Sequence, residues 1–401
     1  MLRDLFPRAH GHYEGSRFAG DLEAFAEWLL AAGYSRPCAH LHLYRLDQAL
    51  EHGDGIQPGG AFSEADLHAA FTSRRGSKPE RSTQRVFTRF LAAVGRLKAA
   101  EPAGPLDMSC RRYLRHLSEA RGLDAATVRQ HRATVADFLA RGLPRGRVLS
   151  AVTPADVEGY VQLRSTEVKR QTLQHIVAHL RAFLRYCGDH GETARGLDRI
   201  DTPRIYRGEQ PPRALDWTLV RKLLASVDRS NGEGWRDYVI LHLMAYYGLR
   251  PCEVVSLTLD SIDWTGRTLR VEQRKTHSVL ILPLADRTVR LLRRYLTEGR
   301  PGTHRPELFL RTRSPAGALT HYSVGDIFHK RARQSGLPLQ GASSYSLRHA
   351  FAMRLLRRGV GVKAIGDLLG HHSLDSTCVY LRIDVDMLRM VALPVPTLTV
   401  S

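Results

Sequence analysis

The chain has 401 residues, of which 43% are hydrophobic, and its 59 Lys+Arg against 40 Asp+Glu give a formal net charge of +19. This length allows two or three domains with a substantial core, and the hydrophobic share excludes wholesale disorder. The positive charge favours a polyanionic partner, nucleic acid first and an anionic membrane second. No apolar run reaches the roughly 20 residues of a spanning helix, so we expect nucleic acid and no membrane.

The five cysteines are scattered and never stand in a CxxC or CxxH arrangement. This is the pattern of neither a zinc site nor a disulfide framework, and we expect no metal site. The first residues, MLRDLFPRAHGH, lack the apolar core of a signal peptide. A reducing cytoplasm is the expected compartment.

The first hundred residues predict amphipathic helices separated by turns. The helices are expected over residues 18–33, over 40–50, from 62 onward and over 82–97. Residues 106–190 repeat this plan at a nearly constant offset. Gly122 follows Gly33 by 122 − 33 = 89 residues, and Thr153 follows Ser63 by 153 − 63 = 90. We interpret this as a tandem duplication of one four-helix unit; the alternative is a loose likeness between two unrelated helical units.

Residues 201–213 (DTPRIYRGEQPPR) contain three prolines and few apolar residues, which predicts an extended linker. Beyond it, helices are expected over 216–227 and 235–247, strands over 268–271 and 279–282, and helices over 285–297 and 323–335. The C-terminal part is therefore expected to be mostly helical with one small sheet.

Three short motifs and one tyrosine in this part bring together residues suited to phosphodiester chemistry. YGLRPCE places Arg250 and Glu253 at i, i+3 where a helix begins, and SLRHAF carries Arg348. A Leu-Gly-His turn ends at His371, and Tyr380 follows after 380 − 371 = 9 residues. Cleavage by a side chain needs a nucleophile, charge stabilisation for a phosphorane-like transition state and an acid for the leaving oxygen. Arginine suits the second task because its planar fork gives paired hydrogen bonds to phosphate.

Taken singly, these residues have ordinary explanations. Each arginine fits a surface ion pair, His371 fits a core histidine, and Tyr380 fits an aromatic residue of an amphipathic helix. The order and spacing of the surrounding motifs favour function.

Together the motifs, over roughly residues 106–390, resemble the tyrosine recombinases, the integrases of phages and transposons. The resemblance implies a mainly α fold with a small β-sheet, in which two N-terminal helical, SAM-like DNA-binding domains precede a mixed α+β catalytic domain. The expected domains are an N-terminal helical domain over 1–100, a core-binding domain over 106–200, a linker over 201–212 and the catalytic domain over 213–401.

The resemblance also implies a role for each motif residue. Arg250 and Arg348 are expected to hold the scissile phosphate, and His371 to hydrogen-bond to it. Tyr380 is expected to attack the phosphorus, form a 3′-phosphotyrosyl link and release a 5′-hydroxyl. The covalent link conserves the bond energy, so no cofactor is expected. Lys275, in the segment EQRKTHSVLILPL, is expected to protonate the leaving oxygen, with the preceding arginine, 274, as the alternative.

One position departs from the family pattern. The family's second motif is usually His-x-x-Arg, whereas here Tyr345 stands three residues before Arg348. A phenol can donate a hydrogen bond to phosphate, but it is a poor base near neutral pH. His349 is expected to point elsewhere on its helix. The departure therefore affects proton transfer from the nucleophile more than phosphate binding.

In this family the core-binding domain clamps one face of double-stranded DNA. The basic residues that we expect to contact phosphates are Arg164, Lys169, Arg170, Arg181 and Arg185. Each of them also fits a helix face that is simply exposed to solvent. The resemblance further implies that the protein is a monomer or dimer when free and assembles into a homo-tetramer on DNA. Paralogous recombinases stay open as further partners. Residues 1–100 are expected to bind further DNA or a neighbouring protomer.

The predicted function is a site-specific recombinase or integrase that cuts and rejoins DNA and so integrates or excises a mobile element. Two alternatives stay open. An accessory recombinase with a weakened active site, acting with paralogues, is favoured by Tyr345. A type IB topoisomerase uses the same chemistry without site specificity.

Overall fold

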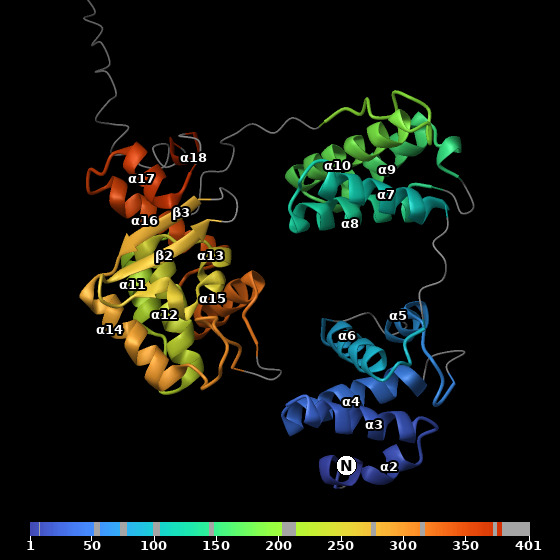
Figure 1. Ribbon diagram of the computed structural model, residues 1–401, viewed down its shortest axis with the longest axis horizontal. Coiled ribbons are helices and arrows are strands. Elements are labelled where there is room, and N and C mark those ends of the chain that lie inside the picture. The colour runs from blue at the N-terminus through green and yellow to red at the C-terminus, as the bar shows by residue number, and fades with distance from the viewer. Residues whose placement is uncertain are drawn as a thin grey trace, which may run out of the picture. The chain divides into compact units, whose positions relative to one another are not determined.

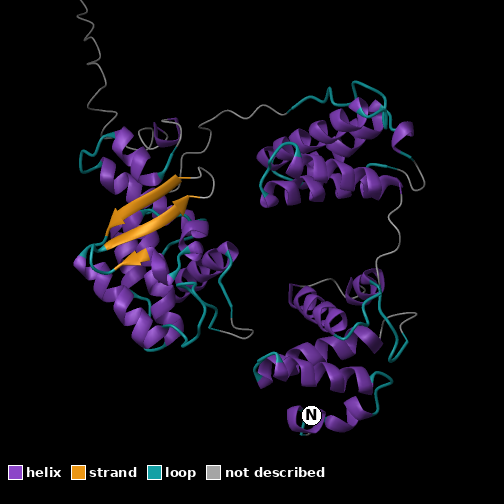
Figure 2. Ribbon diagram, viewed as in Figure 1, coloured by secondary structure: helices purple, strands orange, loops and turns teal. Residues whose placement is uncertain are grey.

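A computed structural model describes residues 1–7, 9–51, 57–72, 78–98, 105–143, 148–202, 214–273, 278–312, 317–371 and 375–378. Within these residues the chain is mainly helical, with one small sheet in its C-terminal part (Figure 1 and Figure 2). The expected fold class is confirmed. No described helix is both long and apolar enough to cross a membrane. Residues 91–209 and 210–401 fall in different compact units, so each group of elements is described by itself.

The first group of helices comprises α1 Leu2–Leu5, α2 His10–Glu14, α3 Ala19–Ala31, α4 Arg36–Glu51, α5 Glu64–Thr72 and α6 Lys78–Ala93. Two of them begin four residues before their predicted starts. Each has a proline as its second residue, Pro37 in α4 and Pro79 in α6. The first turn of a helix tolerates proline because its N–H has no intrahelical partner there.

The second group comprises α7 Pro105–Glu119, α8 Ala125–Arg141, the 3₁₀ turn η1 Leu149–Ala151, α9 Pro154–Glu167 and α10 Arg170–Asp189. Asp124 caps α8 by accepting the N–H groups of Ala126 and Thr127. The helices enclose an apolar core that includes Tyr113, Phe138, Tyr160, Leu180 and Phe183. The linker predicted at 201–212 lies outside the described residues from 203 onward.

The C-terminal group is the only part with a described sheet. Its elements are α11 Trp217–Ala225, α12 Gly232–Tyr247, α13 Pro251–Ser256, η2 Leu259–Ser261, β1 Ile262–Asp263, β2 Thr268–Gln273, β3 Ser278–Pro283, α14 Asp286–Arg294, η3 Tyr295–Gly299, α15 His321–Ser335, α16 Ser344–Leu356, α17 Val362–Leu369 and α18 Asp375–Cys378. The strands are antiparallel in the order β1-β2-β3 (Figure 2). β2 and β3 pair from Thr268↔Pro283 to Gln273↔Ser278, so β2 ends two residues after its predicted end and β3 begins one residue before its predicted start.

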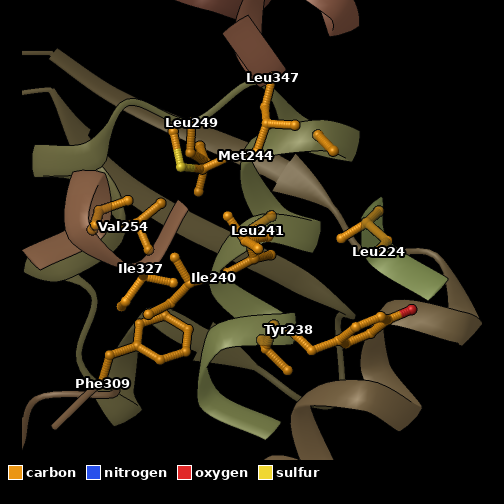
Figure 3. Packing of buried hydrophobic residues seen from close by; sticks show 14 of the residues in the cluster. Leu224, Tyr238, Ile240, Leu241, Met244, Leu249, Val254, Phe309, Ile327 and Leu347 are labelled. Atoms are coloured by element: carbon orange, nitrogen blue, oxygen red, sulfur yellow. The ribbon is translucent and has the colours of Figure 1, made fainter. Parts of the chain in front are cut away.

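Helix α12 forms the centre of this group. Residues 234–245 are all buried, which is typical of a helix surrounded by other elements rather than packed on one side. It contacts α11, α13, α15, α16 and η3. Figure 3 shows its Ile240, Leu241 and Met244 packed among side chains from these neighbours, including Val254 of α13 and Leu347 of α16. The predicted start at 235 is three residues late, because the Asn231 side chain caps the helix by accepting the Gly234 N–H.

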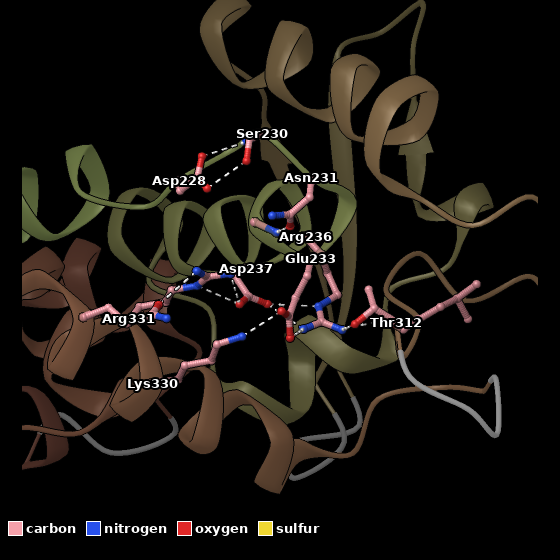
Figure 4. A network of polar contacts seen from close by, with 12 residues as sticks. Asp228, Ser230, Asn231, Glu233, Arg236, Asp237, Thr312, Lys330 and Arg331 are labelled. Atoms are coloured by element: carbon pink, nitrogen blue, oxygen red, sulfur yellow. Dashed lines mark hydrogen bonds and ion pairs between the residues drawn. The ribbon is translucent and has the colours of Figure 1, made fainter. Parts of the chain in front are cut away.

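A buried ionic network joins α12 to α15 (Figure 4). Asp237 is fully buried and accepts hydrogen bonds from Arg236 and from Arg331 of α15. Arg236 also donates to Leu310 O and Thr312 Oγ1, each at 3.2 Å. The network therefore holds one helix pair and the loop that follows η3 in a fixed arrangement.

Candidate active site

The turn between α12 and α13 positions Arg250. Gly248 closes α12 in the left-handed region (φ 64°), where a Cβ would overlap neighbouring side chains. Pro251 then opens α13. Glu253, in the first turn of α13, accepts the Arg250 backbone N–H at 2.7 Å and the Arg250 Nη1 group at 2.6 Å. Glu253 thus fixes both the backbone and the guanidinium of Arg250.

Arg348 approaches the same carboxylate from α16. Its Nη1 atom lies 3.7 Å from Glu253 Oε2, and its side chain is only 5% exposed. Its guanidinium donates to carbonyl oxygens at the ends of α12 and α17. The Arg250 side chain is more accessible, at 18% exposed. Two guanidiniums gathered around one carboxylate leave net positive charge, which suits the binding of a phosphate.

His371 lies beside Arg348, with 3.4 Å between His371 Nε2 and Arg348 Nη2. Its other ring nitrogen, Nδ1, is 2.8 Å from Thr377 Oγ1 on α18. Because a guanidinium can only donate, this contact makes Nε2 the acceptor and assigns the ring proton to Nδ1. Burial, and then the charges of Arg348 and Arg250, lower the pKa of His371 to about 4. The imidazole is therefore neutral at pH 7.

The Leu-Gly-His turn also contacts the end of the β2–β3 hairpin. Gly370 is left-handed (φ 60°), and a Cβ there would overlap the buried Gln273 side chain at the end of β2. The Gly370 carbonyl accepts a hydrogen bond from Arg250 Nη2 at 3.2 Å. The Ser278 hydroxyl, opposite Gln273 in the register, donates to Gln273 Oε1 at 3.1 Å. The four residues between the strands include Lys275, which lies outside the described residues, as does its neighbour at 274.

Tyr345 occupies the first turn of α16 and is 50% exposed. Burial of its other half raises the pKa of the phenol, and the charges of Arg250 and Arg348 oppose this only in part. At neutral pH Tyr345 is therefore a hydrogen-bond donor and not a base. Burial and the charge of Arg348 lower the pKa of His349.

Tyr380 lies outside the described residues, but the helix that precedes it is described. Helix α18 ends at Cys378, and its buried Thr377 packs against Gly366 of α17, where a Cβ would lie 3.0 Å from Thr377 Oγ1. The same hydroxyl contacts His371 Nδ1. The helix that leads to Tyr380 is thus tied to the Leu-Gly-His turn.

The basic residues expected on the core-binding domain fall into two classes. Arg164 is paired with Asp137 and Glu167, Arg185 is paired with Asp198, and Arg181 donates to the Ile200 carbonyl. Lys169 and Arg170, at the start of α10, are exposed. The last two are therefore better placed to meet a polyanion than the first three, whose guanidiniums already bind groups of the chain itself.

Two residues of the candidate active site are not predicted by any pattern in the sequence. Gln273 and Thr377 are buried polar residues that contact Gly370 and His371. Neither belongs to a spacing that suggests chemistry, and only the packing of distant segments reveals them. Among the described residues, no three or more His, Cys, Asp or Glu side chains are grouped as metal ligands are.

The comparisons with known proteins agree along most of the chain. Residues 214–387 match the profile described as the phage integrase family, and residues 110–191 match the phage integrase N-terminal SAM-like domain. An integrase/recombinase of Sinorhizobium fredii, y4rA, is 32% identical over 287 residues, which cover 71% of this chain and 70% of that protein. The tyrosine recombinase XerD of Mycobacterium tuberculosis is 30% identical over 296 residues, covering 70% of this chain and 94% of XerD.

A solved structure, the Tn1549 transposon integrase in complex with circular intermediate DNA, is similar in fold. It has a TM-score of 0.54 and 16% sequence identity, and the match covers 70% of this chain and 98% of that one. At this identity the likeness concerns the fold alone.

Proposed function

The chain belongs to the tyrosine recombinase family, and on that premise we propose that it is a site-specific recombinase that cuts and rejoins double-stranded DNA through a 3′-phosphotyrosyl intermediate. The observation that carries this proposal is the convergence of Arg250, Arg348 and His371 around Glu253 and the Leu-Gly-His turn. These three residues come from helix ends far apart in the sequence, and a packing role alone does not require two arginines and a histidine at one point.

The two arginines bind the scissile phosphate in this proposal. Each guanidinium offers paired donors to a non-bridging oxygen, and Glu253 holds Arg250 in place before DNA arrives. Because their donors are already positioned, little reorganisation is needed as negative charge grows in the transition state. When the phosphate binds, the long contact between His371 Nε2 and Arg348 is lost. The neutral ring then carries its proton on Nε2, which donates to a phosphate oxygen, while Nδ1 accepts the hydrogen bond of the Thr377 hydroxyl.

Tyr380 supplies the nucleophile. Its oxygen forms a bond to phosphorus, the bond from phosphorus to the 5′-oxygen breaks, and the 5′-oxygen takes a proton from Lys275. The phenol proton passes from Tyr380 to solvent water as the bond forms, helped by the charges of Arg250 and Arg348, which favour the phenolate. Attack by the 5′-hydroxyl of another strand reverses these steps and rejoins the DNA, so the energy of the phosphodiester bond is retained. The packing of Gln273 on Gly370 supports the placement of Lys275 near the phosphate.

Double-stranded DNA is the proposed partner, and a homo-tetramer on two DNA sites is the proposed assembly. The net charge of +19 supports the first, and so does the similar transposon integrase in complex with circular intermediate DNA. That likeness also supports a role in moving a mobile element. The tetramer rests on the family resemblance, which also supports the domain boundaries at 1–100, 106–200, 201–212 and 213–401.

One observation favours a second candidate function. Tyr345 is half-exposed and its phenol has a raised pKa, so it cannot take a proton near pH 7 as the family's usual histidine can. A recombinase with slowed cleavage could act beside a paralogue that performs the chemistry. The intact Arg250, Arg348 and His371 favour the active enzyme over this candidate.

A suicide DNA substrate tests the proposal directly. The duplex is taken from sequence flanking the gene and nicked near the cleavage point, so that the cut fragment is lost and the covalent complex accumulates. We expect a protein–DNA adduct on a denaturing gel with the wild type and none with Tyr380→Phe, which removes only the nucleophilic hydroxyl. Tyr322→Phe is the matched control, because Tyr322 is an exposed tyrosine on α15.

Each outcome separates the two candidates. Adduct in the wild type and in the Tyr322→Phe control, but not in Tyr380→Phe, identifies both the nucleophile and the reaction. Tight, salt-sensitive binding of the same DNA without adduct would reject the active enzyme and favour the accessory protein.

A further inference from the structure

The N-terminal helices α3–α6 follow the plan of α7–α10 element by element. A left-handed glycine follows the first helix of each group, Gly33 (φ 81°) and Gly122 (φ 61°). The third helix of each group begins with the same reciprocal cap. Ser63 exchanges hydrogen bonds with the residue three positions later, Asp66, and Thr153 does so with Asp156. The offset of 89 to 90 residues seen in the sequence is thus kept in the structure.

A buried histidine recurs at the same offset in the second helix of each group. His42 of α4 and His131 of α8 are 131 − 42 = 89 residues apart, and both are buried. His42 Nδ1 lies 2.9 Å from Thr83 Oγ1, and His131 Nδ1 lies 2.8 Å from the Tyr113 hydroxyl. A buried histidine bonded to a hydroxyl is not a general need of helix packing, so its recurrence favours one shared plan. The second group matches the SAM-like domain profile.

The charge of the first group is sharply divided. Residues 1–73 contain 5 Lys+Arg and 10 Asp+Glu, a net charge of 5 − 10 = −5, whereas residues 74–98 contain 8 and 1, a net charge of 8 − 1 = +7. The positive segment contains α6, on which Arg81, Arg85 and Arg89 are exposed at i, i+4 and i+8 and form one row. The opposite side of α6 is buried through Val86, Phe87 and Phe90.

We propose that residues 1–98 form a second DNA-binding unit, in which α6 lies against the phosphate backbone of duplex outside the stretch that the recombination core holds. The row of arginines spans eight residues, about 12 Å at 1.5 Å per residue. A DNA strand carries a phosphate about every 3.4 Å of helix axis, so the row faces three or four phosphates. The guanidinium carbon of Arg89 lies over the Trp28 ring, 5.9 Å from its centroid, and this cation–π contact orients the side chain. This inference rests on the proposed function.

A neighbouring copy of this chain matches α6 less well than DNA does. Two copies of the chain repel overall because each carries a net charge of +19, and residues 1–73 of a second copy would offer the row a net charge of only −5. DNA presents the opposite charge at a regular spacing.

The test compares the full-length wild type with the double variant Arg81→Glu, Arg85→Glu. The matched control, Arg3→Glu, Arg36→Glu, reverses two exposed arginines of the same group outside α6. Each protein is titrated with two duplexes, one that carries the recombination site with its flanks and one trimmed to the site. The measured quantity is the ratio of the two affinities, with nuclease protection of the flanks as a second readout.

We expect the wild type and the control to bind the long duplex at least tenfold more tightly than the short one and to protect a flank, and the double variant to do neither. For the long duplex, the loss of two phosphate contacts should lower the slope of log affinity against log salt concentration by about 2. Between 50 and 200 mM salt, the affinity of the wild type should therefore fall about tenfold more than that of the double variant. If the double variant is unfolded by circular dichroism, Arg81→Gln, Arg85→Gln replaces it.

Two results would overturn the inference: equal affinity of the wild type for both duplexes, or an unchanged ratio in the double variant. Adduct formation by the wild type on the suicide substrate is scored separately, so failure of the proposed function and failure of this inference are distinguishable.

Discussion

At the scale of single residues, Glu253 contacts both arginines of the site, which its place in the YGLRPCE motif does not by itself predict. Its carboxylate bonds the backbone and side chain of Arg250 and lies near Arg348, and it is itself buried. A buried carboxylate between two guanidiniums fixes their positions while leaving donors for a phosphate. His371 and Thr377 extend this order to the helix that precedes Tyr380.

Replacing Tyr345 by histidine should speed cleavage. An imidazole with a pKa near neutrality can accept the proton of the nucleophile, which the Tyr345 phenol, whose pKa is raised by burial, cannot do. We expect at least about a tenfold faster single-turnover adduct formation in Tyr345→His at pH 7, since general base catalysis contributes about 10²–10⁴-fold. Tyr345→Phe serves as the control for loss of the hydroxyl. An unchanged or slower rate in Tyr345→His would contradict this role.

Thr377 is expected to act as a positioning residue. Thr377→Val keeps the shape of the side chain but removes the hydroxyl that bonds His371 Nδ1, so the imidazole and α18 lose their link. We expect about a tenfold slower adduct formation with unchanged DNA affinity, and rescue by Thr377→Ser, which restores the hydroxyl. A merely structural role predicts loss of thermal stability in Thr377→Val without a selective effect on the rate.

At the scale of elements, the site depends on how helix ends meet around α12. α13, α16 and α17 contribute Arg250 at a cap, Arg348 as the fifth residue of its helix and His371 just past a left-handed glycine. The Asp237 network then holds α15 against α12 (Figure 4). These contacts place the element ends without themselves touching the reacting groups.

Removing the buried carboxylate of this network should destabilise the C-terminal part strongly. Asp237→Ala leaves Arg236 and Arg331 buried without their shared partner. Breaking a buried pair in this way costs about 3–5 kcal/mol of unfolding free energy. Urea unfolding should show this loss, whereas Glu298→Ala, which removes an exposed i, i+4 pair with Arg294, should cost less than about 0.5 kcal/mol. A similar small cost for both variants would refute the argument.

At the scale of the whole molecule, several histidines are buried in neutral form, and this makes the protein sensitive to acid. His242 of α12 is 1% exposed, bonds Thr288 at 2.9 Å and stacks on Tyr246. Burial lowers its pKa to about 4. His179 of α10 also has a pKa lowered to about 4, first by burial and then by the charges of two neighbouring histidines. Each group that must stay neutral when folded binds a proton more readily when unfolded.

Stability should therefore fall as the pH falls from about 6.5, the unfolded pKa of histidine, to about 4. The stabilising effect of neutral His242 is complete above pH 6.5 and is lost progressively below it, by about 3 kcal/mol in total. Urea midpoints at pH 7 and pH 4.5 measure this. His242→Gln should show a smaller pH dependence than the wild type, and the exposed-site variant His304→Gln should show the same dependence as the wild type. Equal pH dependence in all three proteins would exclude His242 as a cause.

The sequence by itself determined the class of the fold and predicted which residues carry the chemistry. Apolar periodicity predicts the helices, alternation predicts the two main strands, and the motifs around Arg250, Arg348 and His371 predict a phosphate site. These signals are local, because a helix face or a cap depends on residues within a few positions. The starts of α4 and α6 are predicted four residues late, although a proline at the second position, as in both helices, is compatible with the first turn.

Only the tertiary structure decided what depends on contacts between distant segments. The contacts of Gln273 with Gly370 and of Thr377 with His371 join residues whose types and spacing in the sequence do not predict that they meet. The internal partners of Arg164, Arg181 and Arg185 are likewise visible only in the structure, and their contacts with DNA stay a prediction. The buried state that lowers the pKa of His242 likewise exists only when α11–α16 pack around it, since desolvation is a property of the whole enclosure and not of the residue.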